Sequence, residues 1–175
     1  MRKAVYFLGT LLGCGIALAW AQGGAPTDPQ IAAIVVTANQ VDIDAGRLAD
    51  RKAHASDVKA FAQRMVTDHT GVNQAAIGLA HRLHLTPESS ATSASLKQGG
   101  EKNLAALRKL RGAAFDRAYI DHEVAYHQAV LDAMDKVLIP DAQNAELKAL
   151  LVKVRPAFVD HLEHARHIQS ALAGQ

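Results

Sequence analysis

The sequence predicts an all-α protein, a four-helix bundle with a short extra helix in its longest connection. Of its 175 residues 49% are apolar but only 5% are aromatic, a balance typical of helical chains rich in Ala, Leu and Val. Apolar residues recur at helical spacing in four long stretches that are separated by recognisable breaks. No stretch shows the sustained alternation of a β-strand or the turn residues of a hairpin.

Residues 1–21 have the layout of a secretory signal peptide. Arg2 and Lys3 come first, an apolar run follows, and small residues lead up to Ala21. We expect cleavage after Ala21 and export to the periplasm. Two alternatives place the protein at the membrane. One is an uncleaved anchor, because the apolar run of about 18 residues nears the lower limit for a span; the other is a lipoprotein acylated at Cys14.

The composition of the rest of the chain excludes several classes of protein. Without Arg2 and Lys3 the basic residues equal the 17 acidic ones, and a neutral body argues against nucleic-acid binding, which depends on neutralising phosphates. Cys14 is the only cysteine, so no disulfide framework or cysteine-based metal site can form. Because no phosphate-binding, dinucleotide-binding or serine-hydrolase motif occurs, we predict no catalytic residues and favour a protein that is not an enzyme.

The first two long helices follow a Gly- and Pro-rich lead over residues 22–29, and one domain is expected to fill residues 30–173. The first helix is predicted over residues 29–53. The second begins near Ser56 and Asp57, either of which can cap it, and its apolar spacing continues to about residue 83.

The connection to the third long helix is predicted as a loop followed by a short helix. Residues 86–100 are rich in Ser, Thr and Gly, which favours a loop. The spacing of Leu104, Leu107 and Leu110 indicates a short helix over residues 101–111. This connection is long enough to cross the bundle, but its length does not fix the topology.

The third long helix is predicted over residues 113–138, stopped by Pro140, and the fourth over residues 142–173. Pro156 lies inside the fourth helix and is expected to kink or divide it, because proline removes a backbone donor and clashes with the preceding turn. Four such helices with short links within each pair form a bundle.

Each long helix places an ionisable residue at or beside its apolar stripe. Helical projection at about 100° per residue puts five of them on or near the buried face: Asp42, His69, Glu123, His127 and His161. Buried charges are costly unless they are paired or coordinated. We therefore predict a polar centre inside the bundle.

Two interpretations of this centre stay open. Two carboxylates and three imidazoles are the ligand types of a metal site, for which iron, copper and zinc are the candidates. In the other interpretation, Asp42, Tyr119 and Tyr126 hydrogen-bond the imidazoles and no ion is needed. The usual di-iron pattern, with Glu-x-x-His on two helices, does not occur here.

Five further histidines are expected to lie outside this centre. His161 begins a His-x-x-His-x-x-His run, but His164 and His167 project away from the apolar stripe. Such a run could chelate a metal at the surface, and a solvated face is the simpler interpretation. The others expected to be exposed are His54, His81 and His84.

Four segments are similar to those of one known family. They are NQVDIDAGRLA (39–49), VKAFAQRMVTDH (58–69), GAAFDRAYI (112–120) and the region around Pro156 and His161. The family is an exported bacterial one, domain-of-unknown-function family 4142, and the resemblance covers about residues 30–172. It implies a ferritin-like bundle and export. It implies no reaction, because the family has no agreed activity and a fold alone supplies none.

The resemblance also implies which positions matter. The family's acidic pair on the first helix falls on Asp42 and Asp44, where the family usually has Glu. Its other matched positions are Asp68, His69, His127 and His161.

Two candidate functions follow for an exported envelope protein. One is a non-enzymatic, stress-related or interaction protein whose inward network is structural. The other is a metal-binding or metal-dependent redox protein that uses Asp42, His69, Glu123, His127 and His161 as ligands. A metal ion is the one partner that the sequence suggests, and neither substrate nor oligomeric state follows from it.

Overall fold

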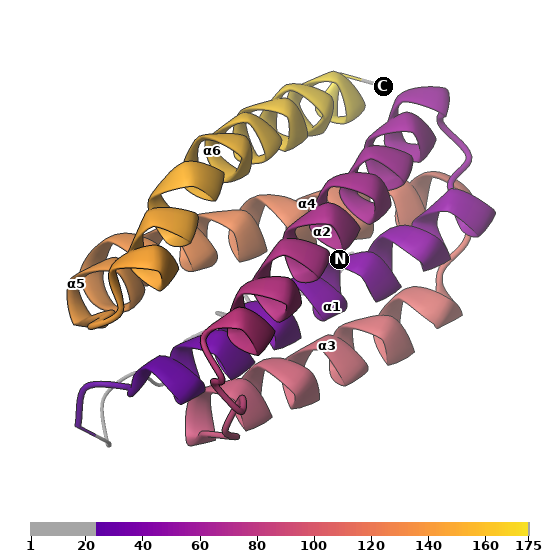
Figure 1. Ribbon diagram of the computed structural model, residues 1–175. Coiled ribbons are helices and arrows are strands. Elements are labelled where there is room, and N and C mark those ends of the chain that lie inside the picture. Colours follow the sequence, from indigo (N-terminus) through magenta and orange to yellow (C-terminus); the bar gives the residue numbers. More distant parts are fainter. Residues whose placement is uncertain (1–23, 175) are drawn as a thin grey trace, which may run out of the picture.

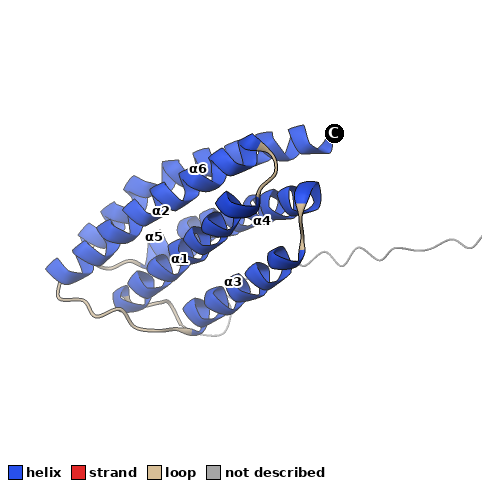
Figure 2. Cartoon of the chain, turned by 90° about the vertical axis from the view of Figure 1, so that its right-hand side faces the viewer, coloured by secondary structure: helices blue, strands red, loops and turns tan. Residues whose placement is uncertain are grey.

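The computed structural model describes residues 24–174, and this part of the chain consists of helices and connecting loops, with no strand (Figure 1; Figure 2). The long helices are α1 (Asp28–Lys52), α2 (Ser56–Arg82), α3 (Ala91–Lys109), α4 (Gly112–Ala133) and α6 (Ala145–Ala173). A π-helical segment (Met134–Leu138) and the short α5 (Ile139–Asp141) prolong α4. The predicted all-α bundle is confirmed, whereas the predicted signal peptide lies outside the described residues.

Four of the long helices form the bundle. α1 packs against α2 and α4, and α6 packs against the same two helices, so α2 and α4 occupy opposite corners. α3 lies along α1, outside this group of four, and runs the length of the bundle (Figure 1; Figure 2). The connection therefore does cross the bundle, and it lets α4 run in the same direction as α2.

The predicted loop over residues 86–100 is wrong, because α3 already begins at Ala91. Ser90 Oγ accepts a hydrogen bond from the Ser93 backbone N–H (3.2 Å), and Ser93 Oγ accepts one from the Ser90 N–H (2.9 Å). Reciprocal caps of this kind start a helix, so the serines mark a helix start. The predicted short helix over residues 101–111 is the C-terminal half of α3.

The prediction that Ser56 or Asp57 caps α2 is also wrong. Its N-cap is Ala55, whose side chain makes no capping hydrogen bond. Instead, the buried Asp116 carboxylate of α4 accepts hydrogen bonds from the backbone N–H groups of His54 (3.0 Å) and Ala55 (2.8 Å). A carboxylate from another helix thus accepts from two backbone donors where the chain enters α2, one of them at the N-cap.

Neither Pro140 nor Pro156 divides a helix. Pro140 does not stop the preceding helix, because the chain continues from α4 through the π-helical segment into α5. Pro140 is the next-to-last residue of this continuous helical run, so the backbone hydrogen bond that it cannot donate is lost only in the last turn. α6 begins at Ala145, after an Asn144 side chain that accepts two backbone N–H groups. It continues through Pro156 undivided.

Two apolar clusters fill the bundle, one toward each end. In α1 the first cluster ends at Val41 and the second begins at Ala45. In α4 the second cluster ends at Ile120 and the first begins at Tyr126. The predicted polar residues of these helices lie in or beside the interval between the clusters. Within the described chain, no helix combines the length and apolar character needed to cross a membrane.

Candidate metal centre

The polar layer between the two apolar clusters gathers side chains from all four bundle helices. α1 supplies one residue, α2 one, α4 two and α6 one, and none of them is more than 2% exposed: Asp42, His69, Glu123, His127 and His161. The structure therefore brings together all five inward residues that helical projection selected. Their role as ligands stays a prediction.

Three imidazoles face one another at the middle of this layer. The ring centroids of His69, His127 and His161 lie 5.6, 5.2 and 5.4 Å apart in pairs. One nitrogen of each ring lies within 4.8 Å of a nitrogen of both others. Nitrogens bound to one ion at about 2.1 Å can be at most about 4.2 Å apart. The spacing of the three rings is therefore close to what one shared ion requires.

Asn39 fixes the orientation of the His69 ring. The Asn39 amide nitrogen donates to the Val35 carbonyl oxygen (2.9 Å), so its Oδ1 must face His69 Nδ1, 2.7 Å away. Because an amide oxygen only accepts, His69 Nδ1 carries the hydrogen. The lone pair of the neutral ring is then on Nε2, which has no hydrogen-bond partner.

The other two rings are held in the same manner. His127 Nδ1–H donates to the Glu123 backbone carbonyl (3.0 Å), and His161 Nε2–H donates to Asp68 Oδ2 (2.9 Å). The remaining nitrogens, His127 Nε2 and His161 Nδ1, have no hydrogen-bond partner. Each ring thus has one nitrogen held by an acceptor and one free lone pair, which is the arrangement of histidines that bind metals.

Two buried carboxyl groups lie against these imidazoles. Asp42 Oδ2 is 3.2 Å from His69 Nε2 and 3.9 Å from His127 Nε2. A carboxylate oxygen and a nitrogen lone pair repel each other unless a proton or a cation lies between them. Glu123 Oε2 is 3.5 Å from His127 Nδ1, and neither of its carboxyl oxygens has a hydrogen-bond partner.

Burial sets the protonation of the layer. Burial lowers the pKa of His69 to about 3 and that of His127 to about 4, and it lowers the pKa of His161 despite the hydrogen bond to Asp68. Burial raises the pKa of the Asp42 carboxyl, against the influence of His127. It also raises the pKa of Glu123, and the Asp42 charge adds to that rise. The imidazoles are therefore neutral, and a proton is readily retained by the carboxyl pair.

Sequence reasoning missed Asn39, and it singled out Asp68 without its role as the acceptor for His161. Asn39 lies one turn before Asp42 on the same face of α1, and this spacing was the available signal. Asp68 is one of the positions matched by the family resemblance. Adjacent residues of a helix point about 100° apart, so Asp68 does not lie on the same face of α2 as His69. The Asp68 carboxylate instead reaches His161 on α6.

The tyrosines do not hydrogen-bond the imidazoles, so Asp42 is the one partner of the second interpretation that lies beside them. Tyr126 Oη donates to the Ala38 carbonyl (3.0 Å), and the buried Tyr119 Oη has no hydrogen-bond partner. Asp42 is close enough to His69 to hydrogen-bond it, but only when it carries a proton.

The other histidines and Asp44 lie away from the three imidazoles. Asp44 is half-exposed and pairs with Gln40 and Arg47 at the surface. The His164 ring packs edge-on against Phe61, and His167 is exposed. The histidines exposed as predicted are His54, His81 and His84. His122, which sequence reasoning did not single out, is half-buried and stacks on Tyr126.

Comparison with known proteins gives one match. A family model described as "Domain of unknown function (DUF4142)" matches residues 17–168. No curated protein and no solved structure matches the chain.

Proposed function

The chain belongs to the DUF4142 family, whose description names no activity, and we propose that it binds a transition metal ion in its buried polar layer. His69 Nε2, His127 Nε2 and His161 Nδ1 are the neutral ligands, and Asp42 is the anionic one. The observation that carries the proposal is the set of three buried, unpartnered nitrogens, each on a ring whose other nitrogen is held by an acceptor.

A metal ion accounts for what is otherwise a costly arrangement. Each buried polar atom without a partner costs about 1–3 kcal/mol, and here several such atoms lie together, from Asp42 and Glu123 as well as from the rings. An ion between the lone pairs and the Asp42 carboxylate turns their repulsion into coordination. The buried Glu123 carboxyl, close to both Asp42 and His127, offers a further oxygen.

The types of ligand atom limit which metals this site would favour. The three nitrogens and the carboxylate include no thiolate or thioether, which disfavours sites that select copper(I) or iron–sulfur clusters. Imidazole suits iron, copper(II) and zinc, and added carboxylates suit iron well. We therefore expect divalent iron, copper or zinc.

The alternative function is a non-enzymatic, stress-related or interaction protein in which the same layer is structural. One observation favours this alternative. Asp42 Oδ2 lies 3.2 Å from His69 Nε2, so a protonated Asp42 can donate a hydrogen bond to that nitrogen. Such a network needs no ion and predicts protein that stays metal-free after loading.

Export remains part of this proposal and has its own test. Mass spectrometry of the protein from its native cells identifies the first residue. A chain that begins at Gln22 supports export with cleavage, an acylated Cys14 at the start indicates a lipoprotein, and an intact Met1 contradicts processing.

Elemental analysis of untagged protein tests the metal. We expect about one equivalent of iron, copper or zinc per chain, and retention of it through gel filtration. His161→Gln should abolish tight binding, because it removes a central ligand. His167→Gln on the same helix is the matched control, because His167 is exposed, and it should bind as the wild type does. Substoichiometric metal after loading, or equal loss in both variants, contradicts the proposal.

A further inference from the structure

The side chains of the polar layer are closed off from solvent. None of the five inward residues is more than 2% exposed. An ion therefore reaches the three imidazoles only when a side chain around them moves. The three rings differ in what holds them, and this difference indicates which of them moves first.

His161 is the ring whose acceptor lies at the surface. The acceptor of His69 is the Asn39 side chain, which is 1% exposed, and that of His127 is a backbone carbonyl of its own helix. His161 Nε2 instead donates to Asp68, whose side chain is 36% exposed. Water can replace an exposed hydrogen-bond partner, whereas a buried group that loses its partner is left unsatisfied. The contact between Asp68 and His161 therefore opens at the lowest cost.

The Asp68 carboxylate faces both the polar layer and the solvent. Its Oδ2 accepts from His161 Nε2 (2.9 Å) and from Arg64 Nε (3.2 Å). Its Oδ1 is not buried and makes no hydrogen bond within the described chain. Carboxylate oxygens are ligands for divalent transition metals. A hydrated cation thus meets a free oxygen on the same carboxylate that holds a central ring.

Arg64 is the charge that such a cation must displace. It lies one turn before Asp68 on α2, and the two side chains are 39% and 36% exposed. Its guanidinium repels a cation that approaches the carboxylate. Ion pairs between exposed groups are weak, so Arg64 restrains access to Asp68 without blocking it.

The other sides of the bundle lack this combination. α1 and α2 pack so closely that a Cβ built at Gly46 would lie 3.0 Å from the Ala62 carbonyl oxygen. α3 packs against both α1 and α4, and α2 and α6 lie on the side away from it (Figure 2). Between α4 and α6, Arg166 donates to the neutral amide oxygen of Gln128 (2.9 Å). A carboxylate that links solvent to a central imidazole is therefore found between α2 and α6.

We propose that metal ions enter and leave the polar layer between α2 and α6, with Asp68 as the first ligand and Arg64 as the gate. The proposal rests on the metal binding proposed above. A cation displaces Arg64 from Asp68, and the loss of that acceptor frees the His161 ring to swing. The ion passes to His69, His127 and Asp42, and His161 Nδ1 then binds it from the surface side. Asp68 is thus a positioning residue that also controls the rate of exchange.

Rates of metal exchange test the gate. The probe is cobalt(II), whose visible absorption changes when imidazoles bind it. Stopped-flow mixing with the metal-free chain gives the association rate, and an excess of chelator gives the dissociation rate. Arg64→Gln should speed both rates several-fold by a similar factor and leave the affinity nearly unchanged, because a gate alters the barrier and not the bound state. Arg166→Gln is the matched control, because it removes an exposed arginine between α4 and α6, and both rates should stay at the wild-type values.

A second pair of variants tests Asp68 itself. Asp68→Asn keeps an oxygen that accepts from His161 but removes the charge that attracts the cation, so association should slow several-fold. Asn39→Ala removes the buried acceptor of His69 and should act mainly on dissociation, as most losses of affinity do.

The outcomes separate the route from the metal site. Normal cobalt binding with unchanged rates in Arg64→Gln, or with the same change in Arg166→Gln, overturns the route and leaves the metal proposal intact. Faster association with slower dissociation in Arg64→Gln also overturns the gate, because that pattern reports a change of charge alone. A wild-type chain that binds no cobalt contradicts the metal proposal, and the route with it.

Discussion

At the residue scale, the acceptors around the imidazoles decide what the polar layer can do. An Asn39 oxygen, a backbone carbonyl and the Asp68 carboxylate each hold one ring nitrogen. The pKa of Asp68 is lowered by its hydrogen bonds with His161 and Arg64, which outweigh its partial burial. It is therefore an anionic acceptor, and such acceptors make the opposite nitrogen a better metal ligand.

Loss of the Asn39 acceptor should weaken metal binding although Asn39 touches no metal. We expect Asn39→Ala to lower the affinity by about 10–100-fold, measured by competition with a zinc chelator. Asn39→Asp keeps an acceptor and should restore most of the affinity. The matched control is Asn73→Ala, because Asn73 is also buried and donates to a backbone carbonyl of α1. Equal losses at both asparagines would indicate a general effect of packing.

The buried imidazoles should make the metal-free protein acid-sensitive. The pKa of His127 falls from the ordinary 6.5 to about 4 in the folded state. Between these two pH values the unfolded chain binds a proton that the folded chain does not, so the free energy of unfolding decreases as the pH falls from 6.5 toward 4. His69 and His161 act in the same sense. The raised pKa values of Asp42 and Glu123 increase the free energy of unfolding as the pH falls. The pH dependence of the wild type alone therefore does not report on the histidines.

A variant isolates the histidine contribution. In urea unfolding of the metal-free protein, the wild type should lose about 1 kcal/mol more per pH unit than His127→Gln between about pH 6.5 and 5, because the unfolded His127 is only partly protonated near pH 6.5. His81→Gln changes an exposed side chain and should parallel the wild type. If His127→Gln also runs parallel to the wild type, the imidazole is not held neutral by the fold.

At the element scale, the contact between α3 and α1 depends on one glycine. A Cβ built at Gly100 would lie 2.7 Å from Val41 Cγ2, whereas one at Gly99 would meet nothing within 4 Å. Gly100→Ala should destabilise the protein by about 1–3 kcal/mol, because the valine must move in a packed core. Gly99→Ala should instead stabilise it by about 0.5–1 kcal/mol through helix propensity. Chemical denaturation measures both, and a stabilising Gly100→Ala would contradict this packing.

The helix boundaries show what a single sequence can and cannot predict. The α1 and α2 ranges follow from apolar spacing, which also selected Asp42 and His69. The start of α3 does not, because Ser90 and Ser93 become a cap only when the residues between them turn into a helix. The cap of α2 comes from Asp116, about 60 residues further along the chain, and a contact of that kind depends on the tertiary fold.

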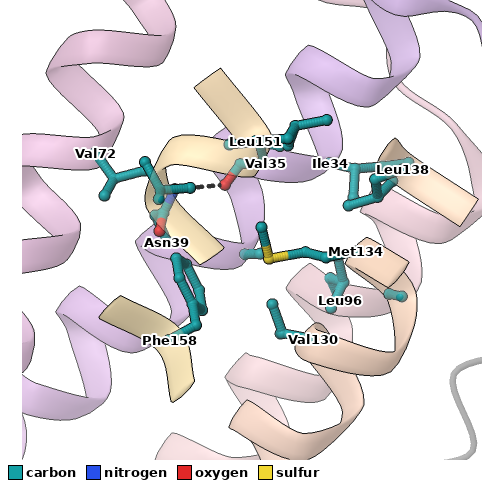
Figure 3. A pocket seen from close by; sticks show the side chains of 13 residues that line it. Ile34, Val35, Asn39, Val72, Leu96, Val130, Met134, Leu138, Leu151 and Phe158 are labelled. Carbon is teal, nitrogen blue, oxygen red and sulfur yellow. Dashed lines mark hydrogen bonds between the residues drawn. The ribbon is translucent and has the colours of Figure 1, made fainter. Parts of the chain in front are cut away.

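At the scale of the whole molecule, the polar layer lies between two apolar clusters. Projection found its five inward residues because burial follows helical periodicity. It could not find which nitrogen of each ring is free, because that depends on contacts such as Asn39 with His69 and Asp68 with His161. A small apolar pocket lined by Met134 and Leu138 of the π-helical segment (Figure 3) likewise depends on how this segment packs against α1 and α6.

The central claim is that one transition metal ion occupies the meeting point of the three imidazoles. Anomalous diffraction from crystals of the loaded protein, collected at the absorption edge of the metal, locates the ion directly. We predict one peak at about 2.0–2.3 Å from His69 Nε2, His127 Nε2 and His161 Nδ1. A peak only at surface histidines such as His167, or none in the polar layer, would contradict this account.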